Sequence, residues 1–262
     1  MDVNKNSYTI GFAAVMVIIV AALLSSAAIG LKPFQAKNIE QEKKQNILKS
    51  VGVEVSREQA EVIYSDYIKQ QLVLNSKGEI KEGKSAFDVN LAKEVKKDIK
   101  VQDLPLYIAE VDGETKYIIP LRGKGLWGPI WGFISLNDDL NTISAAVFDH
   151  SKETPGLGAE INTEKFQNPF TGRTIFDGVT FTSVKVVKSI KNKKNQVNGI
   201  SGGTITSVGV SKMIEERLSR YLLYFESISP EMKVESVVNI IDTDEQSDTT
   251  SNINESEIIN YE

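Results

Sequence analysis

Residues 8–31 form an uninterrupted apolar run without a charged side chain. The run is longer than the roughly 20 residues that an α-helix needs to cross a bilayer. The small residues of "SSAA" and the basic Lys5 would also fit a cleaved secretory signal, but the run is long for the apolar part of a signal. The pattern therefore favours a transmembrane anchor over residues 1–32, and the alternative is a secreted domain released by signal cleavage.

The charges that flank this run give a weak indication of its orientation. Lys5 is offset by Asp2 on the N-terminal side. Four lysines follow the run: Lys32, Lys37, Lys43 and Lys44. Under the positive-inside rule alone, this asymmetry favours a cytoplasmic location for the C-terminal side.

Between the anchor and residue 100 the pattern is helical. The polar stretch 37–53 precedes "SREQAEVIYSDYIKQQLVL", in which Ser56 and Gln59 have the spacing of a capping box. Four apolar or aromatic positions then share one helical face: Ala60, Ile63, Tyr64 and Ile68. We expect residues 33–100 to form a helical linker and the N-terminal part of a soluble domain.

Residues 101–230 change to a strand pattern. Apolar runs surround "DGE" in "PLYIAEVDGETKYIIPLRG" and "NDDLN" in "IWGFISLNDDLNTISAAVFDH", which predicts two hairpins. The β-branched "GVTFTSVKVVKSI" predicts another strand, and "VGVSKMIEERLSRYLLYFES" predicts an amphipathic helix. The apolar face of that helix would comprise Met213, Ile214, Leu218, Tyr221 and Leu222. The predicted fold is α+β, with one N-terminal transmembrane helix followed by an antiparallel-sheet domain.

Composition narrows the chemistry available to the chain. Its net charge of −5 is uneven, because residues 241–262 hold seven acids and no Lys or Arg, which predicts a disordered acidic tail over 231–262. The sequence has no stripe of basic residues of the kind that would indicate nucleic-acid binding. The absence of Cys excludes disulfides, thiol catalysis and iron–sulfur ligation, and a single His argues against a dedicated zinc site. Redox chemistry would therefore need an organic cofactor.

A glycine pair among hydroxyl residues, "ISGGTITS" (200–207), stands at the start of the predicted C-terminal helix. Backbone amides at a helix N-terminus, with glycines that allow close approach, suit a phosphate group. The stretch lacks the Lys-Ser/Thr of a P-loop and the three spaced glycines of a dinucleotide fingerprint. Taken alone, it also fits a glycine turn followed by a Ser or Thr N-cap.

Two further stretches combine glycines with groups that could contact a ring. "GKGLWGPIWGFISL" (123–136) carries both tryptophans of the chain, which could stack on a flat ring but more often fill a core or an interface. "HSKETPGLGAEI" (150–161) contains the only histidine, and His150 alone is more often structural than catalytic.

Taken together and in this order, "GKGLWGPIWGFI", "HSKETPGLGAEI" and "ISGGTITSVGV" resemble the family formed by the C subunits of sodium-translocating NADH:quinone oxidoreductases. They resemble the G subunits of Rnf electron-transport complexes more distantly. The N-terminal anchor agrees with this resemblance, which covers residues 1 to about 230.

The resemblance implies an FMN joined through its phosphate to a threonine side chain, here Thr204. Ser201 and Gly202 match the family motif around the modified residue. Gly203 stands where Ala is usual, and Asn198 stands where an acidic residue is usual. Thr206 is the nearest alternative acceptor.

By the same resemblance, the "ETPGLG" loop contacts the flavin. The implied contacts are Glu153, Thr154, Gly156 and Leu157. Trp127 and Trp131 are further candidates for ring or interface contacts.

The implied function is that of an electron carrier in a respiratory complex, with the other subunits and a maturing flavin transferase as partners. The family places the domain on the periplasmic side of the bacterial inner membrane, opposite to the weak charge indication. Two alternatives remain at this point: an Rnf-type subunit with ferredoxin and NAD as outer couples, and a membrane-anchored sensor or binding module without flavin.

Overall fold

The computed structural model describes residues 6–229, and the acidic tail expected at 231–262 lies outside them. The α-helices are α1 (Asn6–Lys49), α2 (Arg57–Tyr67), α3 (Leu91–Glu94), α4 (Glu164–Gln167), α5 (Thr204–Ser219) and α6 (Leu222–Ile228). Short 3-10 helices are η1 (Ala86–Asp88), η2 (Ile99–Val101), η3 (Gly158–Asn162) and η4 (Asn168–Phe170). The strands are β1 (Ile68–Leu74), β2 (Leu104–Val111), β3 (Glu114–Lys124), β4 (Pro129–Leu136), β5 (Ile143–His150), β6 (Phe176–Asp177), β7 (Thr180–Phe181), β8 (Lys185–Val187) and β9 (Gln196–Asn198).

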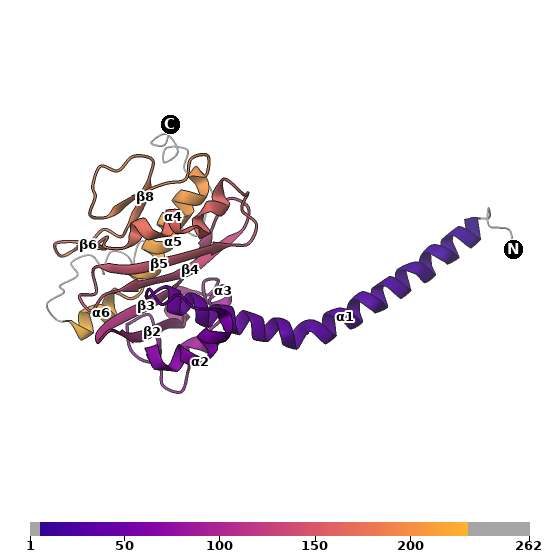
Figure 1. Cartoon of the computed structure of the whole chain (residues 1–262), viewed down its shortest axis with the longest axis horizontal. Helices are drawn as coiled ribbons and strands as arrows, with labels where there is room; N and C mark the ends of the chain where they lie inside the picture. Colours follow the sequence, from indigo (N-terminus) through magenta and orange to yellow (C-terminus); the bar gives the residue numbers. More distant parts are fainter. Residues whose placement is uncertain (1–5, 230–262) are drawn as a thin grey trace.

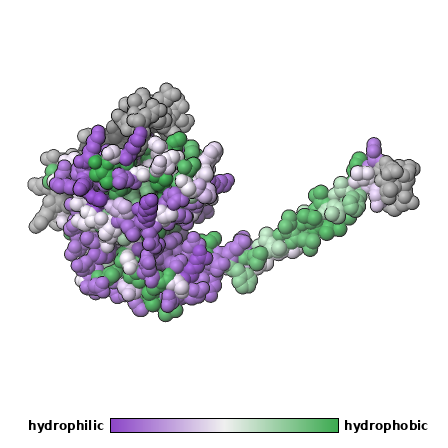
Figure 2. Space-filling view, turned by 45° about the horizontal axis from the view of Figure 1, so that its top comes forward, coloured by the Kyte–Doolittle hydropathy of each residue, from purple (hydrophilic) through white to green (hydrophobic). Residues whose placement is uncertain are grey.

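Helix α1 joins the apolar run to the domain without interruption. It is 44 residues long, continues through Pro33, and is long and apolar enough to cross a membrane. Figure 1 shows its N-terminal part extending away from the domain, and Figure 2 shows that this part has a hydrophobic surface. Only the C-terminal end is buried, where Ile47 and Leu48 pack against the domain. Within residues 6–229, α1 is the one helix long and apolar enough to cross a membrane, and its C-terminal end packs on the domain.

A five-stranded antiparallel meander, in the order β1-β2-β3-β4-β5, forms the centre of the domain. The β2–β3 turn contains Asp112 and Gly113, both with positive φ (53° and 80°), as a tight hairpin requires. The segment "NDDLN" connects β4 to β5, which pair as the predicted second hairpin. Both predicted hairpins, and the α+β fold with its antiparallel sheet, are therefore confirmed.

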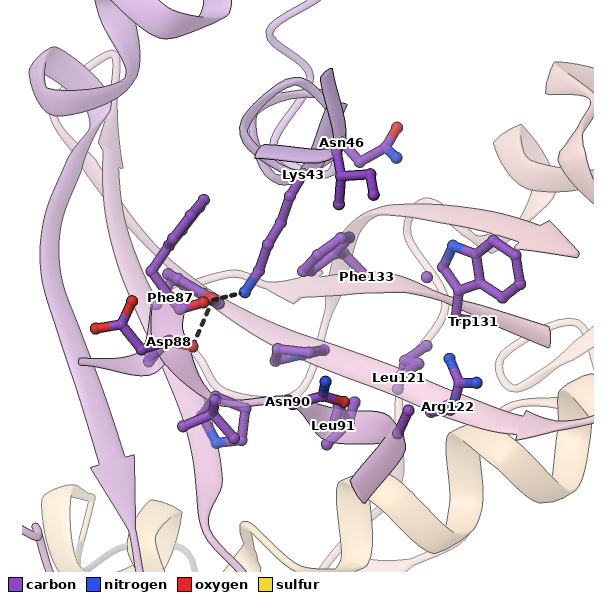
Figure 3. Close-up of a pocket in the computed structure, with 18 of the residues that line it drawn as sticks. Lys43, Asn46, Phe87, Asp88, Asn90, Leu91, Leu121, Arg122, Trp131 and Phe133 are labelled. Carbon is purple, nitrogen blue, oxygen red and sulfur yellow. Dashed lines mark hydrogen bonds between the residues drawn. The ribbon is translucent and has the colours of Figure 1, made fainter. Parts of the chain in front are cut away.

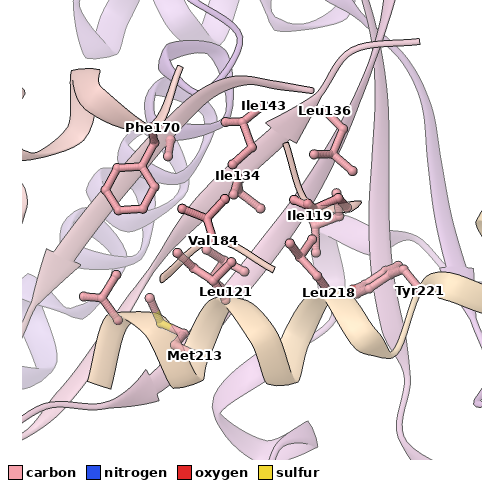
Figure 4. Packing of buried hydrophobic residues seen from close by; sticks show 14 of the residues in the cluster. Ile119, Leu121, Ile134, Leu136, Ile143, Phe170, Val184, Met213, Leu218 and Tyr221 are labelled. Atoms are coloured by element: carbon pink, nitrogen blue, oxygen red, sulfur yellow. The ribbon is translucent and has the colours of Figure 1, made fainter. Parts of the chain in front are cut away.

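The sheet separates two hydrophobic clusters. One lies between the sheet and α5 with α6, and Figure 4 shows Met213, Leu218 and Tyr221 facing strand residues such as Ile119 and Ile134. The predicted apolar face of this helix is confirmed, because Met213, Ile214, Leu218, Tyr221 and Leu222 are all buried. The other cluster lies on the opposite face of the sheet, under the end of α1 and α2.

The helix predicted after Ser56 is longer than the helix in the structure. The capping box of Ser56 and Gln59 is present, but α2 ends at Tyr67 and the expectation of helix at Ile68 is wrong. Residues Ile68–Leu74 instead form β1, which pairs with β2. Pairing with residues 30 or more positions further along the chain satisfies the main chain here, and this tertiary contact outweighs the local helical pattern.

Two boundaries in the C-terminal part also differ from the sequence pattern. "GVTFTSVKVVKSI" forms two separate short strands, β7 and β8, because Ser183 between them adopts a positive φ of 56°. Helix α5 begins at Thr204, four residues before the predicted start, and it is followed by a separate α6. Thr204 is therefore the first residue of the helix.

Candidate functional site

The N-terminus of α5 has no side-chain cap. Its N-cap is Gly203, and no acidic residue occupies its first turn. The first main-chain hydrogen bond of the helix runs from the Ser207 amide to the Gly203 carbonyl. Within residues 6–229, no hydrogen bond uses the amides of Thr204, Ile205 or Thr206. The positive end of a 16-residue helix therefore faces outward with its donors available.

Glycines bring the 154–158 loop into contact with this helix start. Gly202 has a φ of +73°, and a Cβ there would lie 2.7 Å from Cδ2 of Leu157. A Cβ on Gly203 would lie 3.3 Å from the backbone nitrogen of Gly158. The two motifs, about 45 residues apart in sequence, therefore touch through positions where a larger side chain has little room.

Glu153 is the centre of the hydrogen bonding between these loops. Its side chain is buried (5% exposed), and its Oε2 accepts a hydrogen bond of 2.6 Å from the Thr206 hydroxyl. Its Oε1 accepts a hydrogen bond of 2.9 Å from the Trp127 backbone amide. The Glu153 backbone amide donates to Nδ1 of His150 at 3.3 Å. One carboxylate thus joins the glycine–tryptophan turn, the 150–158 loop and α5.

Two glycines that sequence reasoning missed make room for this carboxylate. A Cβ on Gly125 would lie 2.5 Å from Oε1 of Glu153, and a Cβ on Gly158 would lie 2.3 Å from Oε2. Both glycines stand inside the quoted motifs, but the sequence carries no signal that they face the same carboxylate.

Serine hydroxyls attach the buried side of α5 to the preceding loops. The Ser207 hydroxyl accepts a hydrogen bond of 3.0 Å from the Ile200 amide, which closes the "SGGT" turn. The Ser211 hydroxyl accepts one of 2.7 Å from the Val186 amide. Sequence reasoning did not select either serine. Their spacing of four residues, which places both on one side of the helix, is the signal that could have found them.

The predicted acceptor residues differ in their surroundings. Thr204 is partly buried, whereas Thr206 is 1% exposed and its hydroxyl is bonded to Glu153. Ser201 and Gly202 are exposed beside Thr204, and Asn198 ends β9 with an exposed side chain.

Exposed apolar side chains occur on the three segments that meet near the helix start. Trp127 is 63% exposed, and Leu157 and Ile205 are each 40% exposed. Thr154 and Gly156 are exposed on the same loop as Leu157. These residues present an apolar surface beside the free amides, which suits an anionic group attached to a flat ring.

Trp131 does not belong to this cluster. It lies in β4 between Ile130 and Gly132, opposite Arg122 of β3. Side chains alternate along a strand, so Trp131 shares the face of Phe133, under α1, and Ile130 shares the face of α5. The structure therefore places Trp131 on the sheet face opposite the Glu153 site, so of the two roles expected for it, ring or interface contact, this position favours an interface.

Comparisons with known proteins match the part of the chain that carries these motifs. The FMN-binding domain family matches residues 125–219, a range that includes Glu153, Thr204 and Thr206. The crystal structure of the C subunit of Na(+)-translocating NADH-quinone reductase from Parabacteroides distasonis is similar, with a TM-score of 0.69 and 45% identity, and the match covers 74% of this chain and 96% of that chain.

Two further relatives carry the same name. The C subunit of the Na(+)-translocating NADH-quinone reductase of Vibrio alginolyticus is 28% identical over 220 residues, which cover 77% of this chain and 86% of the relative. That of Pseudomonas aeruginosa is 28% identical over 236 residues, which cover 80% of this chain and 90% of the relative.

Proposed function

Because the chain belongs to the C-subunit family of Na(+)-translocating NADH-quinone reductases, we propose that it is the membrane-anchored FMN-carrying subunit of such a complex. In this proposal it relays electrons between redox centres of the assembly, and the FMN is joined through its phosphate to Thr204. The name shared by the relatives favours a quinone reductase over an Rnf-type complex.

We choose Thr204 over Thr206 because their hydroxyl groups differ in burial and in hydrogen bonding. The Thr206 hydroxyl is buried and already donates to Glu153, so its modification would break that bond and require room that is absent. Thr204 is partly exposed, and its hydroxyl takes part in no hydrogen bond within residues 6–229. Its side chain is therefore the more accessible nucleophile for a flavin transferase.

The helix start supports the phosphate end of the cofactor. The amides of Thr204, Ile205 and Thr206 supply donors, and the positive end of the α5 dipole stabilises an anion. Exposed Ser201 and Gly202 leave the approach open. At Gly203, a Cβ would lie 3.0 Å from Cγ2 of Ile200, so glycine in place of the usual alanine relieves a tight contact.

The ring end of the cofactor would lie on the exposed apolar surface. Leu157 and Trp127 border the helix start, and Thr154 and Gly156 continue the same rim. The FMN supplies the redox chemistry, and these residues orient its ring and limit access of water to one side. Glu153 holds the rim in place through Thr206 and the Trp127 amide.

The remaining parts of the proposal concern location and partners. Residues 8–31 of α1 span the inner membrane with the N-terminus inside, and the FMN domain lies on the periplasmic side, where long domains translocate regardless of a few lysines. The other subunits of the complex are its electron-transfer partners. A flavin transferase matures it, and exposed Asn198, six residues before Thr204 in the sequence, stands where the family usually has an acidic residue.

The direct test is flavin retention after denaturation. The complex is purified from the native host and denatured in SDS, and flavin fluorescence is measured on the separated chain. Wild type and Thr206→Ser are expected to retain fluorescence, because serine keeps the hydroxyl that bonds to Glu153, and Thr204→Val is expected to lose it. Fluorescence retained in Thr204→Val would reject Thr204 as the acceptor, and a non-fluorescent wild-type chain would reject covalent attachment altogether.

A further inference from the structure

A cavity of about 600 Å³ lies on the face of the sheet opposite α5. Its walls are residues 36–46 of α1, the segment 86–92 and strands β2 to β4. Figure 3 shows Lys43 entering from α1 on one side and Arg122 beside Trp131 on another. This cavity is separate from the Glu153 site, because Tyr107, Trp131 and Phe133 of its lining point to the other face of the sheet.

The cavity begins next to the end of the membrane span. Ala36, the first α1 residue in its wall, follows Leu31 by five residues, which is about 8 Å along a helix. The polar headgroup layer of a bilayer extends roughly 5–8 Å beyond the hydrocarbon core. The part of the cavity wall formed by Ala36 therefore lies at or just beyond the level of lipid headgroups.

Apolar and aromatic side chains form much of the lining. Phe87, Leu91, Trp131 and Phe133 line it together with the backbone around Leu121. An open apolar cavity of this size beside a membrane is favourable for a ligand that brings its own hydrocarbon part.

Five charged residues line the cavity: Glu40, Glu42, Lys43, Asp88 and Arg122. Within residues 6–229, neither Lys43 nor Arg122 forms a salt bridge, and the Asp88 carboxylate lies near Lys43, on the side of the cavity away from Arg122 (Figure 3). Glu40 pairs with Lys44 at 2.8 Å, and Glu42 pairs with Arg57 at 3.2 Å. The Lys43 ammonium donates to the Phe87 carbonyl and lies 4.3 Å from the Phe87 ring centroid.

Arg122 differs from these residues. Its guanidinium lies 5.9 Å from the Trp131 ring centroid, and within residues 6–229 no carboxylate pairs with it. Guanidinium presents a planar fork of donors that matches phosphate geometry. An anion is therefore the missing partner on this wall.

We propose that the cavity binds one anionic phospholipid of the membrane leaflet from which α1 emerges. The lipid phosphate contacts Arg122, and the adjoining hydrocarbon packs against Phe87, Trp131 and Phe133. A lipid fits better than a free phosphate because the walls are largely apolar and adjoin the span. The proposal rests on the membrane anchor and not on the flavin, so it can fail while the proposed function holds.

Native mass spectrometry of the full-length chain in detergent tests it. Phosphatidylglycerol is titrated against wild type, Arg122→Gln, Arg122→Lys and the control Arg173→Gln, whose guanidinium donates to the Pro169 and Lys193 carbonyls outside the cavity wall. We expect one tightly retained phosphatidylglycerol in wild type and in Arg173→Gln. Loss of the bidentate contact should weaken retention about tenfold in Arg122→Gln and less in Arg122→Lys.

The titration and further measurements separate the alternatives. Equal retention by wild type and Arg122→Gln, with unchanged far-ultraviolet circular dichroism, would overturn the proposal. Equal retention of phosphatidylcholine would show that headgroup charge does not matter and would also overturn it. Displacement of the lipid by millimolar inorganic phosphate would identify an anion site without a lipid role and would overturn it as well. Lack of displacement, with Phe133→Ala weakening retention, would support the lipid.

Discussion

The two faces of the central sheet are built differently. On the α5 face, a buried carboxylate joins three loops, and glycines stand where a methyl group would collide with it. On the α1 face, next to the membrane anchor, lies a cavity of about 600 Å³, and its Arg122 guanidinium forms no salt bridge with any residue of 6–229. Close packing and satisfied hydrogen bonds hold a site in one geometry, whereas an open apolar cavity accepts a mobile ligand. The difference indicates that one face positions a fixed group and the other meets the membrane.

The largest effect is expected where α5 approaches the sheet most closely. A Cβ on Gly209 would lie 2.4 Å from the Lys124 carbonyl oxygen, so Gly209→Ala must move α5 away from β3. We expect the free energy of unfolding to fall by about 3 kcal/mol. Tryptophan fluorescence of the full chain in detergent during urea unfolding measures it. Gly30→Ala in α1, where a Cβ meets nothing within 4 Å, is the control and should change little.

The second largest loss of stability is expected when the Glu153 carboxylate is removed. Glu153→Ala leaves the Thr206 hydroxyl and the Trp127 amide without their acceptor, and should lower the free energy of unfolding by about 2 kcal/mol. Thr206→Val should cost about 1 kcal/mol. Because the two side chains share one hydrogen bond, the double variant should cost less than the sum. Strict additivity would argue against the Glu153–Thr206 contact, and exposed Glu164→Ala is the control.

On the cavity face, Lys43 gives a pH-dependent effect. Burial lowers the pKa of Lys43 to about 8, below its usual 10.5, although the nearby Asp88 carboxylate acts in the opposite direction. Between these values the unfolded chain binds more protons than the folded chain, so the stability contribution of Lys43 rises with pH. Allowing for partial exposure, wild type should gain about 1 kcal/mol relative to Lys43→Met between pH 7 and about 9.5. Equal pH slopes in urea titrations of the two proteins would contradict the lowered pKa.

The smallest expected effect is at the capping box of α2. Ser56 accepts from the Gln59 amide, and the Gln59 side chain accepts from the Ser56 amide. Ser56→Ala should cost about 0.5 kcal/mol, since the cap is exposed, and Ser56→Asp should restore most of the loss. Hydrogen exchange of the first-turn amides of α2 measures this loss of stability. A loss of stability in Ser56→Ala larger than that in Glu153→Ala would contradict the proposal that the α5 face is the more tightly held of the two.

Local signals explain why much of the fold could be predicted. The β2–β3 hairpin follows from "DG" between apolar runs, and α2 begins where Ser56 and Gln59 place its cap. Strand β1 could not be predicted, because its identity depends on pairing with β2 rather than on its own helical spacing. The start of α5 at Thr204 was missed because Gly203 caps the helix without any side-chain bond.

Less of the candidate site than of the fold could be predicted from the sequence. Three motifs identified the loops and their hydroxyl groups, but the roles of Gly125 and Gly158 appear only when the Glu153 carboxylate lies between them. Trp127 and Trp131 are four residues apart and look equivalent in sequence, yet strand alternation directs Trp131 to the opposite face. The cavity is formed by α1, the 86–92 segment and three strands, so no local pattern reveals it.

The central claim is that Thr204, and not Thr206, carries the FMN phosphate. The most direct measurement is tandem mass spectrometry of the peptide that contains both residues, from protein purified from its native host. The account predicts an FMN-sized mass increase localised to Thr204, with an unmodified Thr206 that remains bonded to Glu153. The same mass on Thr206, or a peptide without added mass, would contradict it.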